Sequence, residues 1–225
     1  MWAVILILVL VLGFVLYKKA KPHVSPEVKL KKLKPEWKES KESKFLKGAT
    51  QKKNNGNLEG AIRDLRAAYE IYDRGYIIPS VDVLLRLPSY LQLAGRKDEA
   101  WSEYNKLIVK VDNYWNDPEI APMMYSKIYD KMRLFLQREN KYEKAVKFGV
   151  FSHVMWSMGL LKQQRKTELK ELNTTASLRN IANKLLRKTK YNCKDELVAI
   201  MEDFVRRLPS IDLANLGRNV DKLFH

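Results

Sequence analysis

The stretch from residue 81 to residue 111, VDVLLRLPSYLQLAGRKDEAWSEYNKLIVKV, constrains the fold more tightly than any other part of the chain. It predicts two helices joined by a polar turn at Ala94-Gly95-Arg96-Lys97, where Gly95 supplies the backbone freedom that a tight turn needs. In the second helix the apolar residues have the spacing of one helical face: Ala100, Trp101, Tyr104, Leu107, Ile108 and Val111. A small side chain at Ala100 lets the two helices approach closely. The stretch therefore predicts a helical hairpin.

The same spacing recurs twice, each time after a polar turn. After Asn54-Asn55-Gly56-Asn57 it selects Ala61, Ile62, Leu65, Ala68, Tyr69 and Tyr72. After Arg138-Glu139-Asn140-Lys141 it selects Ala145, Val146, Gly149, Ser152, His153 and Trp156. The intervals between the three copies are unequal, so insertions separate them. Asp117-Pro118 marks one insertion and predicts the start of a new helix, with the aspartate as its cap. Together the three copies predict an all-α fold of stacked helical hairpins.

These segments resemble the tetratricopeptide (TPR) repeat family. The resemblance is carried by GNLEGAI at 56–62, GRKDEAW at 95–101 and NKYEKAV at 140–146, and it covers roughly residues 45–158. The match is degenerate, because Ala49, Pro88 and Arg133 stand where the family has a packing glycine. Pro88 lacks a backbone N–H, so we expect it to kink its helix.

The resemblance implies a concave groove that is lined by the first helix of each hairpin and holds a peptide or helix of a partner protein. In the second and third hairpins the family frame places these residues in the partner groove: Asp82, Leu85, Arg86, Ser89, Gln92, Lys127, Asp130, Lys131, Leu134, Gln137 and Arg138. The lysine and asparagine set with which some family members clamp a terminal carboxylate is not reproduced. Chaperone docking is therefore not implied.

The first seventeen residues, MWAVILILVLVLGFVLY, carry no charged side chain and would reach about 25 Å as a helix. A cleaved signal peptide would have basic residues before the apolar run and a small-residue cleavage site after it, and both are missing. A buried core helix would seldom be apolar on every face. We therefore favour a transmembrane anchor. Lysines follow this run and none precedes it, which predicts a single-pass membrane protein with the amino terminus outside and the body cytosolic.

The chain carries a formal charge of +16, and much of the excess lies in a lysine- and proline-rich linker directly after the apolar run. This linker is either a solvated spacer or a segment attracted to anionic lipid headgroups. The residues expected at the membrane surface are Lys18, Lys19, Lys21, Lys29, Lys31, Lys32 and Lys34. Both roles are compatible with a tether between a membrane anchor and a folded body.

Beyond Trp156 the sequence stays helical but leaves the repeated phase. Thr174-Thr175 predicts a helix start before the stripe Leu178, Ile181, Ala182, Leu185 and Leu186. A second stripe contains Leu197, Ile200, Met201, Phe204, Val205 and Leu208, and a last short helix spans 211–223. The predicted organisation is a transmembrane helix at 1–17, a basic linker at 18–44, TPR-like hairpin repeats at 45–172 and a C-terminal helical cap at 173–225.

A second basic cluster lies in this C-terminal part: Lys162, Arg165, Lys166, Lys170, Arg179, Lys184, Arg187, Lys188 and Lys190. The simplest interpretation is the solvated face of amphipathic helices. The alternative is a surface for nucleic acid, although a basic helix face by itself reads no sequence. A membrane-tethered nucleic-acid-binding protein is therefore the second functional hypothesis, after an adaptor for a cytosolic protein.

Motifs of enzymes are missing. His153 falls at a core position of the repeated stripe, and no second metal ligand has suitable spacing. Cys193 lies near Lys190 and Lys194, but no histidine is spaced to act as its base. No phosphate-binding glycine loop, paired-cysteine motif or nucleophile elbow occurs. We therefore expect neither an enzyme nor a cofactor, metal or small-molecule substrate.

Overall fold

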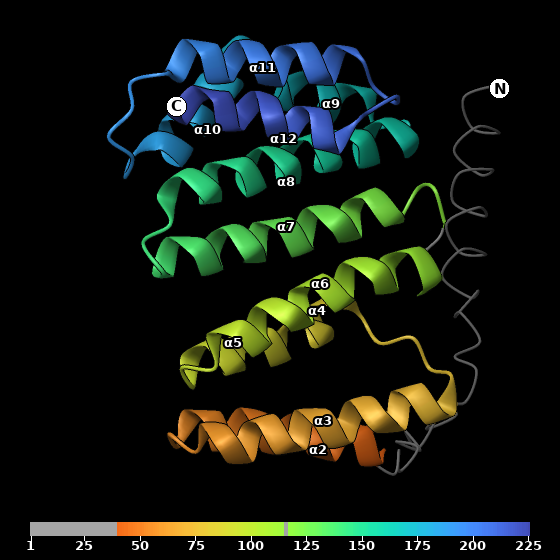
Figure 1. The fold of residues 1–225 in the computed structure, drawn as a ribbon. Helices are drawn as coiled ribbons and strands as arrows, with labels where there is room; N and C mark the ends of the chain where they lie inside the picture. Colours follow the sequence, from red (N-terminus) through yellow and green to blue (C-terminus); the bar gives the residue numbers. More distant parts are fainter. Residues whose placement is uncertain (1–39, 115–116) are drawn as a thin grey trace, which may run out of the picture. The chain divides into compact units, whose positions relative to one another are not determined.

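A computed structural model describes residues 40–114 and 117–225, and within these ranges the chain forms helices and no strand (Figure 1). The helices are α2 (Lys41–Asn54), α3 (Leu58–Gly75), α4 (Val81–Leu84), α5 (Arg86–Leu93), α6 (Lys97–Tyr114), α7 (Ala121–Arg138), α8 (Tyr142–Lys162), α9 (Lys166–Leu172), α10 (Thr175–Leu186), α11 (Lys194–Arg206) and α12 (Leu213–Asp221), followed by a 3₁₀ turn at Lys222–Phe224. The predicted all-α fold class is confirmed.

The predicted anchor at residues 1–17 and most of the predicted linker lie outside the described residues. Among the helices of residues 40–114 and 117–225, none combines the length and the apolar composition that crossing a bilayer requires. The membrane prediction therefore depends on the sequence of the first seventeen residues.

Five helix ends in the described residues share one backbone geometry, and one of them is the end of α3, where Tyr76 has a φ of 49° and Ile77 N–H donates to Tyr72 O at 3.0 Å. The other four are turns between helices. Gly56, Gly95, Asn140 and Gln164 all have a positive φ, between 57° and 79°. In the first turn Asn57 N–H donates to Lys52 O at 2.9 Å, which is the bond that closes a Schellman motif, and the same bond recurs in the other three. The turns at 56, 95 and 140 are the predicted ones, whereas the fourth, between α8 and α9, was not predicted.

The second helix of each hairpin buries most of the predicted stripe, although in α8 Val146 packs on the C-terminal helices and not on the first helix of its hairpin. The leading alanines of the stripe, Ala61, Ala100 and Ala145, are all buried, as are Leu65 and Tyr104 one turn later. A methyl group at the first position leaves room for the facing helix, so the backbones can approach closely. The packing therefore follows from the repeated spacing in the sequence.

The first helix of the second hairpin is interrupted at Leu85, which separates α4 from α5. Pro88 lies three residues further on and has no N–H to donate to Leu84 O, so the helical ladder lacks a bond at this point. The expected kink thus takes the form of a break between two short helices.

Two predicted boundaries are corrected by the structure. Helix α2 begins at Lys41, inside the predicted linker, because the Ser40 side chain accepts from Ser43 N and caps it. Helix α7 begins at Ala121 and not at Pro118. Asp117 caps only a turn, with Glu119 N donating to its carboxylate at 2.8 Å, and the continuous helix starts after that turn.

The C-terminal helices α10, α11 and α12 pack against α8 and form a second hydrophobic core around it. Helix α8 serves both cores: Ala145 and Met155 belong to the hairpin core, whereas Val146, Val150 and Val154 belong to the second. The predicted start of α10 is confirmed, because Thr174 caps it by accepting from Ser177 N.

Candidate partner-binding surface

The first helices of the second and third hairpins lie side by side and run in the same direction. Lys127 Nζ lies 2.7 Å from an Asp82 carboxylate oxygen near the start of α4 and α7. Gln92 Nε2 donates to Phe135 O at 3.1 Å near the end of α5 and α7. The later residue of α5 contacts the later residue of α7, so α4–α5 and α7 run parallel to each other. A partner chain could therefore contact both at once.

The first helix of the first hairpin joins the same layer through one arginine. Arg86 of α5 donates from Nη2 to Leu46 O and to Thr50 Oγ1 of α2, each at 2.8 Å. Its guanidinium carbon also lies 5.8 Å from the centre of the Tyr90 ring. Arg86 therefore ties helices together in addition to bordering an open surface.

One stripe of α7 faces away from the cores. Lys127, Lys131, Leu134 and Arg138 follow each other at helical spacing, and all four are exposed or half-buried. Within the described residues no side chain forms an ion pair with Lys131. Together with Asp82, Arg86 and Tyr90 of α4–α5, these four residues form a surface that we call the first-helix face.

Three residues predicted for the groove serve packing instead. Leu85 is 2% exposed and belongs to the hairpin core. Gln92 is 7% exposed, and its amide spans from α5 to α7, where its oxygen also accepts from Arg138 at 3.0 Å. Ser89 donates to Leu85 O at 2.7 Å within its own helix. Leu85 and Gln92 therefore contact neighbouring helices, and the Ser89 hydroxyl is used along its own helix.

The remaining predicted groove residues lie at the edge of the first-helix face. Asp130 accepts from Arg133 Nη2 at 2.6 Å, and Gln137 accepts from Arg133 Nη1 at 3.1 Å. These contacts neutralise Asp130 and hold Arg133 along α7. The net positive charge of the face therefore comes from Arg86, Lys131 and Arg138, because Lys127 is paired with Asp82.

Sequence reasoning missed Tyr90 and Leu93. They follow Arg86 at helical spacing on α5, and Leu93 is 53% exposed. The spacing from Arg86 could have found them, since residues four and seven positions later share its side of a helix. The face thus contains aromatic and aliphatic groups as well as charge, which suits an amphipathic partner segment.

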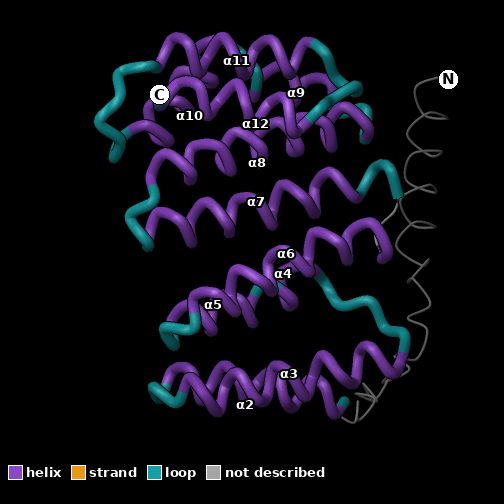
Figure 2. The backbone as a smooth tube through the Cα atoms, in the orientation of Figure 1, coloured by secondary structure: helices purple, strands orange, loops and turns teal. Residues whose placement is uncertain are grey.

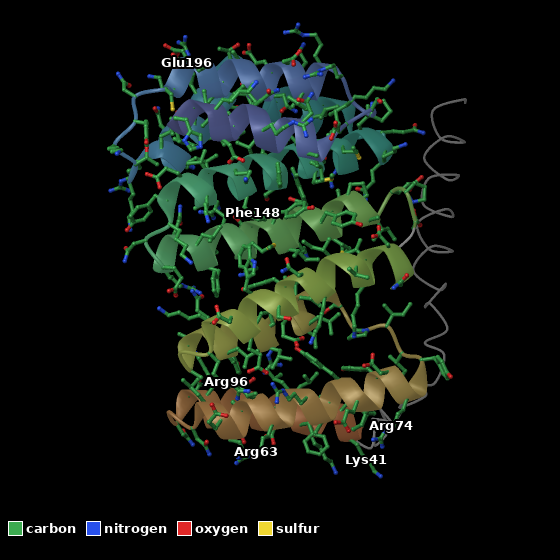
Figure 3. All side chains as sticks on the ribbon, viewed as in Figure 1. Lys41, Arg63, Arg74, Arg96, Phe148 and Glu196 are labelled. Atoms are coloured by element: carbon green, nitrogen blue, oxygen red, sulfur yellow. The ribbon has the colours of Figure 1, made fainter. Side chains whose placement is uncertain are left out.

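Trp101 of α6 belongs to an aromatic cluster between the second and third hairpins. Its ring centre is 5.4 Å from Phe135 and 5.5 Å from Phe148, which Figure 3 labels between α7 and α8. The indole is half-buried and borders a hollow of about 260 Å³ together with Lys97 and Lys144. Trp101 is therefore only partly buried by packing, and part of its indole stays accessible.

His153 is buried and accounts for a polar link between α8 and the start of α10. Its Nε2 lies 2.9 Å from Asn173 Oδ1, and the Asn173 amide also contacts Ser157 at 3.2 Å. Burial lowers the pKa of His153 to about 4, so the ring is neutral at physiological pH. The predicted packed, hydrogen-bonded histidine is confirmed.

The described residues offer no site for a metal ion, because they contain no group of three or more His, Cys, Asp or Glu side chains placed to bind one. Cys193 is buried, and burial together with nearby Glu196 raises its pKa. A raised thiol pKa disfavours the thiolate that a nucleophile or metal ligand needs.

The basic residues after α8 are spread out. Lys162 is the last residue of α8, whereas Lys188 lies over the ring of Tyr142, the first residue of the same helix. The length of α8 places them about 30 Å apart. Arg165 is paired with Glu168, and Arg179 lies 3.7 Å from Asp195. The second basic cluster is therefore a partly neutralised band along α8 to α10 and not one patch.

Comparison of the chain with protein-family models, with curated proteins and with solved structures gives no match. The functional argument consequently depends on the residues and geometry described above.

Proposed function

We propose that the protein is a membrane-anchored, TPR-like adaptor that holds a cytosolic protein on its first-helix face. The observation that carries this proposal is the parallel placement of α4–α5 and α7, tied at both ends by Asp82–Lys127 and by Gln92 with Phe135. Parallel first helices beside antiparallel second helices are the arrangement that the resemblance implies. The repeated Schellman turns and buried alanines support the same interpretation.

The chemistry of the face favours an acidic, amphipathic partner segment. Lys131 and Arg138 are exposed cations on the open stripe of α7, and Leu134 between them offers apolar contact. Complementary charge steers such a segment to the surface and fixes its register more than it adds raw affinity. The proposed anchor at residues 1–17 would keep any bound partner at the membrane.

Membrane topology can be tested with intact cells or right-side-out vesicles that contain the full chain. Protease added outside should leave residues 18–225 uncut, and cleavage should require permeabilisation. Cleavage of the body in intact cells would reverse the proposed orientation.

The partner surface can be tested with the double variant Lys131→Glu/Leu134→Asp. These side chains have no polar partner that the change would orphan, so the variant should fold and melt close to wild type. Arg86 is a poorer choice, because it ties α5 to α2 through two hydrogen bonds. The matched control is Arg63→Glu, which reverses one exposed charge on the second helix α3 (Figure 3).

The measurement is affinity capture of the intact protein from its own membranes, with identification of the proteins that co-purify. We expect at least one protein to be retained by wild type and by Arg63→Glu but lost from Lys131→Glu/Leu134→Asp. The proposal fails if the folded double variant captures every protein that wild type captures.

A further inference from the structure

The two ends of the hairpins differ in their connections. Figure 2 shows the tight turns after α2, α5 and α7 at one end, and the longer connections after α3 and α6 at the other. Near this end Lys110 of α6 lies 3.4 Å from Asp73 of α3, and Tyr125 of α7 donates a hydrogen bond to Asp112 of α6. Residue 40, where the described chain begins, lies at this second end. We call it the tether end: residues 40–45, 75–81, 109–113 and 117–121.

Exposed apolar side chains gather at the tether end. In the described residues every large apolar side chain that is clearly exposed lies there except Leu93: Phe45, Tyr76, Ile77, Ile78, Val109 and Ile120. Scattered exposed apolar residues are normal, but a concentration at one end marks a surface that contacts something else. At the opposite end, where the tight turns after α2, α5 and α7 lie, Leu93 is the one large apolar side chain of the described residues that is clearly exposed.

Tyr76 is the most unusual member of this group. Its φ is 49°, in the left-handed region, and its side chain is 94% exposed. The left-handed residues at the other four helix ends of this geometry are glycine, asparagine and glutamine, whereas a bulky aromatic residue is disfavoured there. The conformation projects the ring away from the body, with Ile77 and Ile78 directly after it. The left-handed conformation closes α3, because Ile77 N–H donates to Tyr72 O at 3.0 Å, but this closure does not require an aromatic side chain.

The shape of this tip suits a fluid partner better than a folded one. Ile78 is half-exposed, and the hollow between it and Leu84 measures about 10 Å³, which is too small to accept a side chain. A larger hollow of about 260 Å³ lies beside it between α3 and α6, but charged residues such as Arg66, Glu70 and Lys106 line it, and the Tyr76-Ile77-Ile78 loop does not. A protein partner gains affinity by filling pockets, whereas an aromatic ring followed by two isoleucines can enter the headgroup region of a bilayer without one. A bilayer would also be close to this end, because the segment that leads to the proposed anchor joins the body at Ser40.

We infer that the tether end rests on the membrane, with the Tyr76-Ile77-Ile78 loop inserted among the lipid headgroups. This inference builds on the membrane anchor of the proposed function. Because the anchor already holds the body near the bilayer, a weak partition of three side chains is enough to keep the loop inserted. The first helices would then point away from the membrane, so a partner would lie at a fixed distance from the surface.

The test uses the full chain, reconstituted in phosphatidylcholine vesicles that contain a minority of phosphatidylserine. All variants carry Cys193→Ala, so that one introduced cysteine takes an environment-sensitive fluorophore. The test position is Tyr76→Cys, and the matched control is Leu93→Cys, an exposed apolar position at the opposite end. Lipids with a spin label near the headgroup quench a fluorophore only at that depth. Circular dichroism checks that each variant keeps its helix content.

The expected result is blue-shifted emission and strong quenching at position 76, with neither change at position 93. Equal emission and no quenching at both positions would overturn the inference. So would a blue shift at 76 without lipid quenching, since residues 1–17 or a second copy of the chain would then cover the loop. Equal quenching at both positions would also overturn it, because the body would then have no preferred end.

Alkaline extraction of the same vesicles separates this inference from the proposed anchor. A spanning chain stays with the vesicles, and deletion of residues 2–17 should release it. If alkali releases the full chain, the proposed transmembrane anchor is wrong. Quenching at position 76 then still shows whether the loop enters the headgroup region. If the chain resists extraction but position 76 is not quenched, the anchor stands and the loop inference fails.

Discussion

The hairpin region, residues 40–162, and the C-terminal region, residues 166–225, are both helical but are held together differently. In the hairpin region each unit repeats one turn and one buried stripe, so neighbours in sequence are neighbours in space. In the C-terminal region α10, α11 and α12 have no common phase and gather around α8. Contacts there fold the end of the chain back on itself and on α8: Lys147 Nζ of α8 lies 2.6 Å from Asp221, and Tyr191 donates to Phe224 O at 2.8 Å.

The difference shows two ways of stabilising a helical body. Between the first two hairpins an ionic chain runs from Arg66 through Glu99 and Arg96 to Glu59, on the surface and along a repeated interface. Exposed ion pairs of this kind contribute little each. Both regions also have an apolar core, and the core of the C-terminal region includes residues of α8. Since α8 belongs to both cores, we expect a substitution that destabilises one region to destabilise the other as well.

The largest expected effect comes from truncating either core. Leu65→Ala in the hairpin core and Leu197→Ala in the C-terminal core each remove a fully buried side chain, so each should lower the free energy of unfolding by about 2–5 kcal/mol. Denaturant unfolding of the full chain in detergent, followed by circular dichroism, should show one transition for both variants. Val109→Ala, at an exposed position, is the control and should change little. Two separate transitions would contradict the shared role of α8.

The next effect is the pH dependence of the C-terminal junction. The pKa of buried His153 is about 4, below the ordinary 6.5, so between these values the unfolded chain binds a proton that the folded chain does not. Its contribution is complete above pH 6.5 and is lost as the pH falls toward 4, by roughly 3 kcal/mol in all. His153→Gln removes this loss while keeping a hydrogen-bonding group. Parallel stability profiles of wild type and His153→Gln across this window would show that the ring does not titrate as described.

A smaller effect is expected where the two regions meet at Gly149. A methyl group added there would lie 2.3 Å from Leu185 Cδ2 of α10 and 3.0 Å from Arg133 Cδ of α7. Crowding costs about 1–3 kcal/mol, and the better helix propensity of alanine recovers about 1 of it, so Gly149→Ala should destabilise by about 1 kcal/mol. Adding Leu185→Ala removes the clash, so the double variant should lose less stability than the two single losses together. Strict additivity would mean that the two residues do not interfere.

The smallest effect compares two left-handed residues within the hairpin region. Tyr76→Gly relieves the conformation at φ 49° and should raise stability by about 0.5–1 kcal/mol in detergent, where no bilayer contacts the loop. Gly95→Ala puts a side chain at φ 78° and should lower it by about 1 kcal/mol. Thermal melts of both variants measure the difference. A loss of stability in Tyr76→Gly would mean that the tyrosine ring supports the fold.

The amino-acid sequence by itself determined the helical class, three of the five Schellman-type helix ends in the described residues and the buried alanines. These features are local: a turn residue with positive φ and a stripe at helical spacing are written in neighbouring residues. The sequence also placed Thr174 as a helix cap and His153 in the interior. For the candidate surface it found Lys127, Lys131, Leu134 and Arg138, because α7 is regular and one spacing describes its open side.

Only the tertiary structure decided where that regularity fails. The helix is interrupted at Leu85, and Leu85 and Gln92 are both buried, so the spacing of one continuous helix did not give their exposure. The docking of α10 to α12 on α8 joins residues far apart in the chain, so no local pattern predicts it. The gathering of Tyr76 and Ile120 at one end depends likewise on how the hairpins stack. Burial and proximity are properties of the packed chain, whereas periodicity belongs to each helix alone.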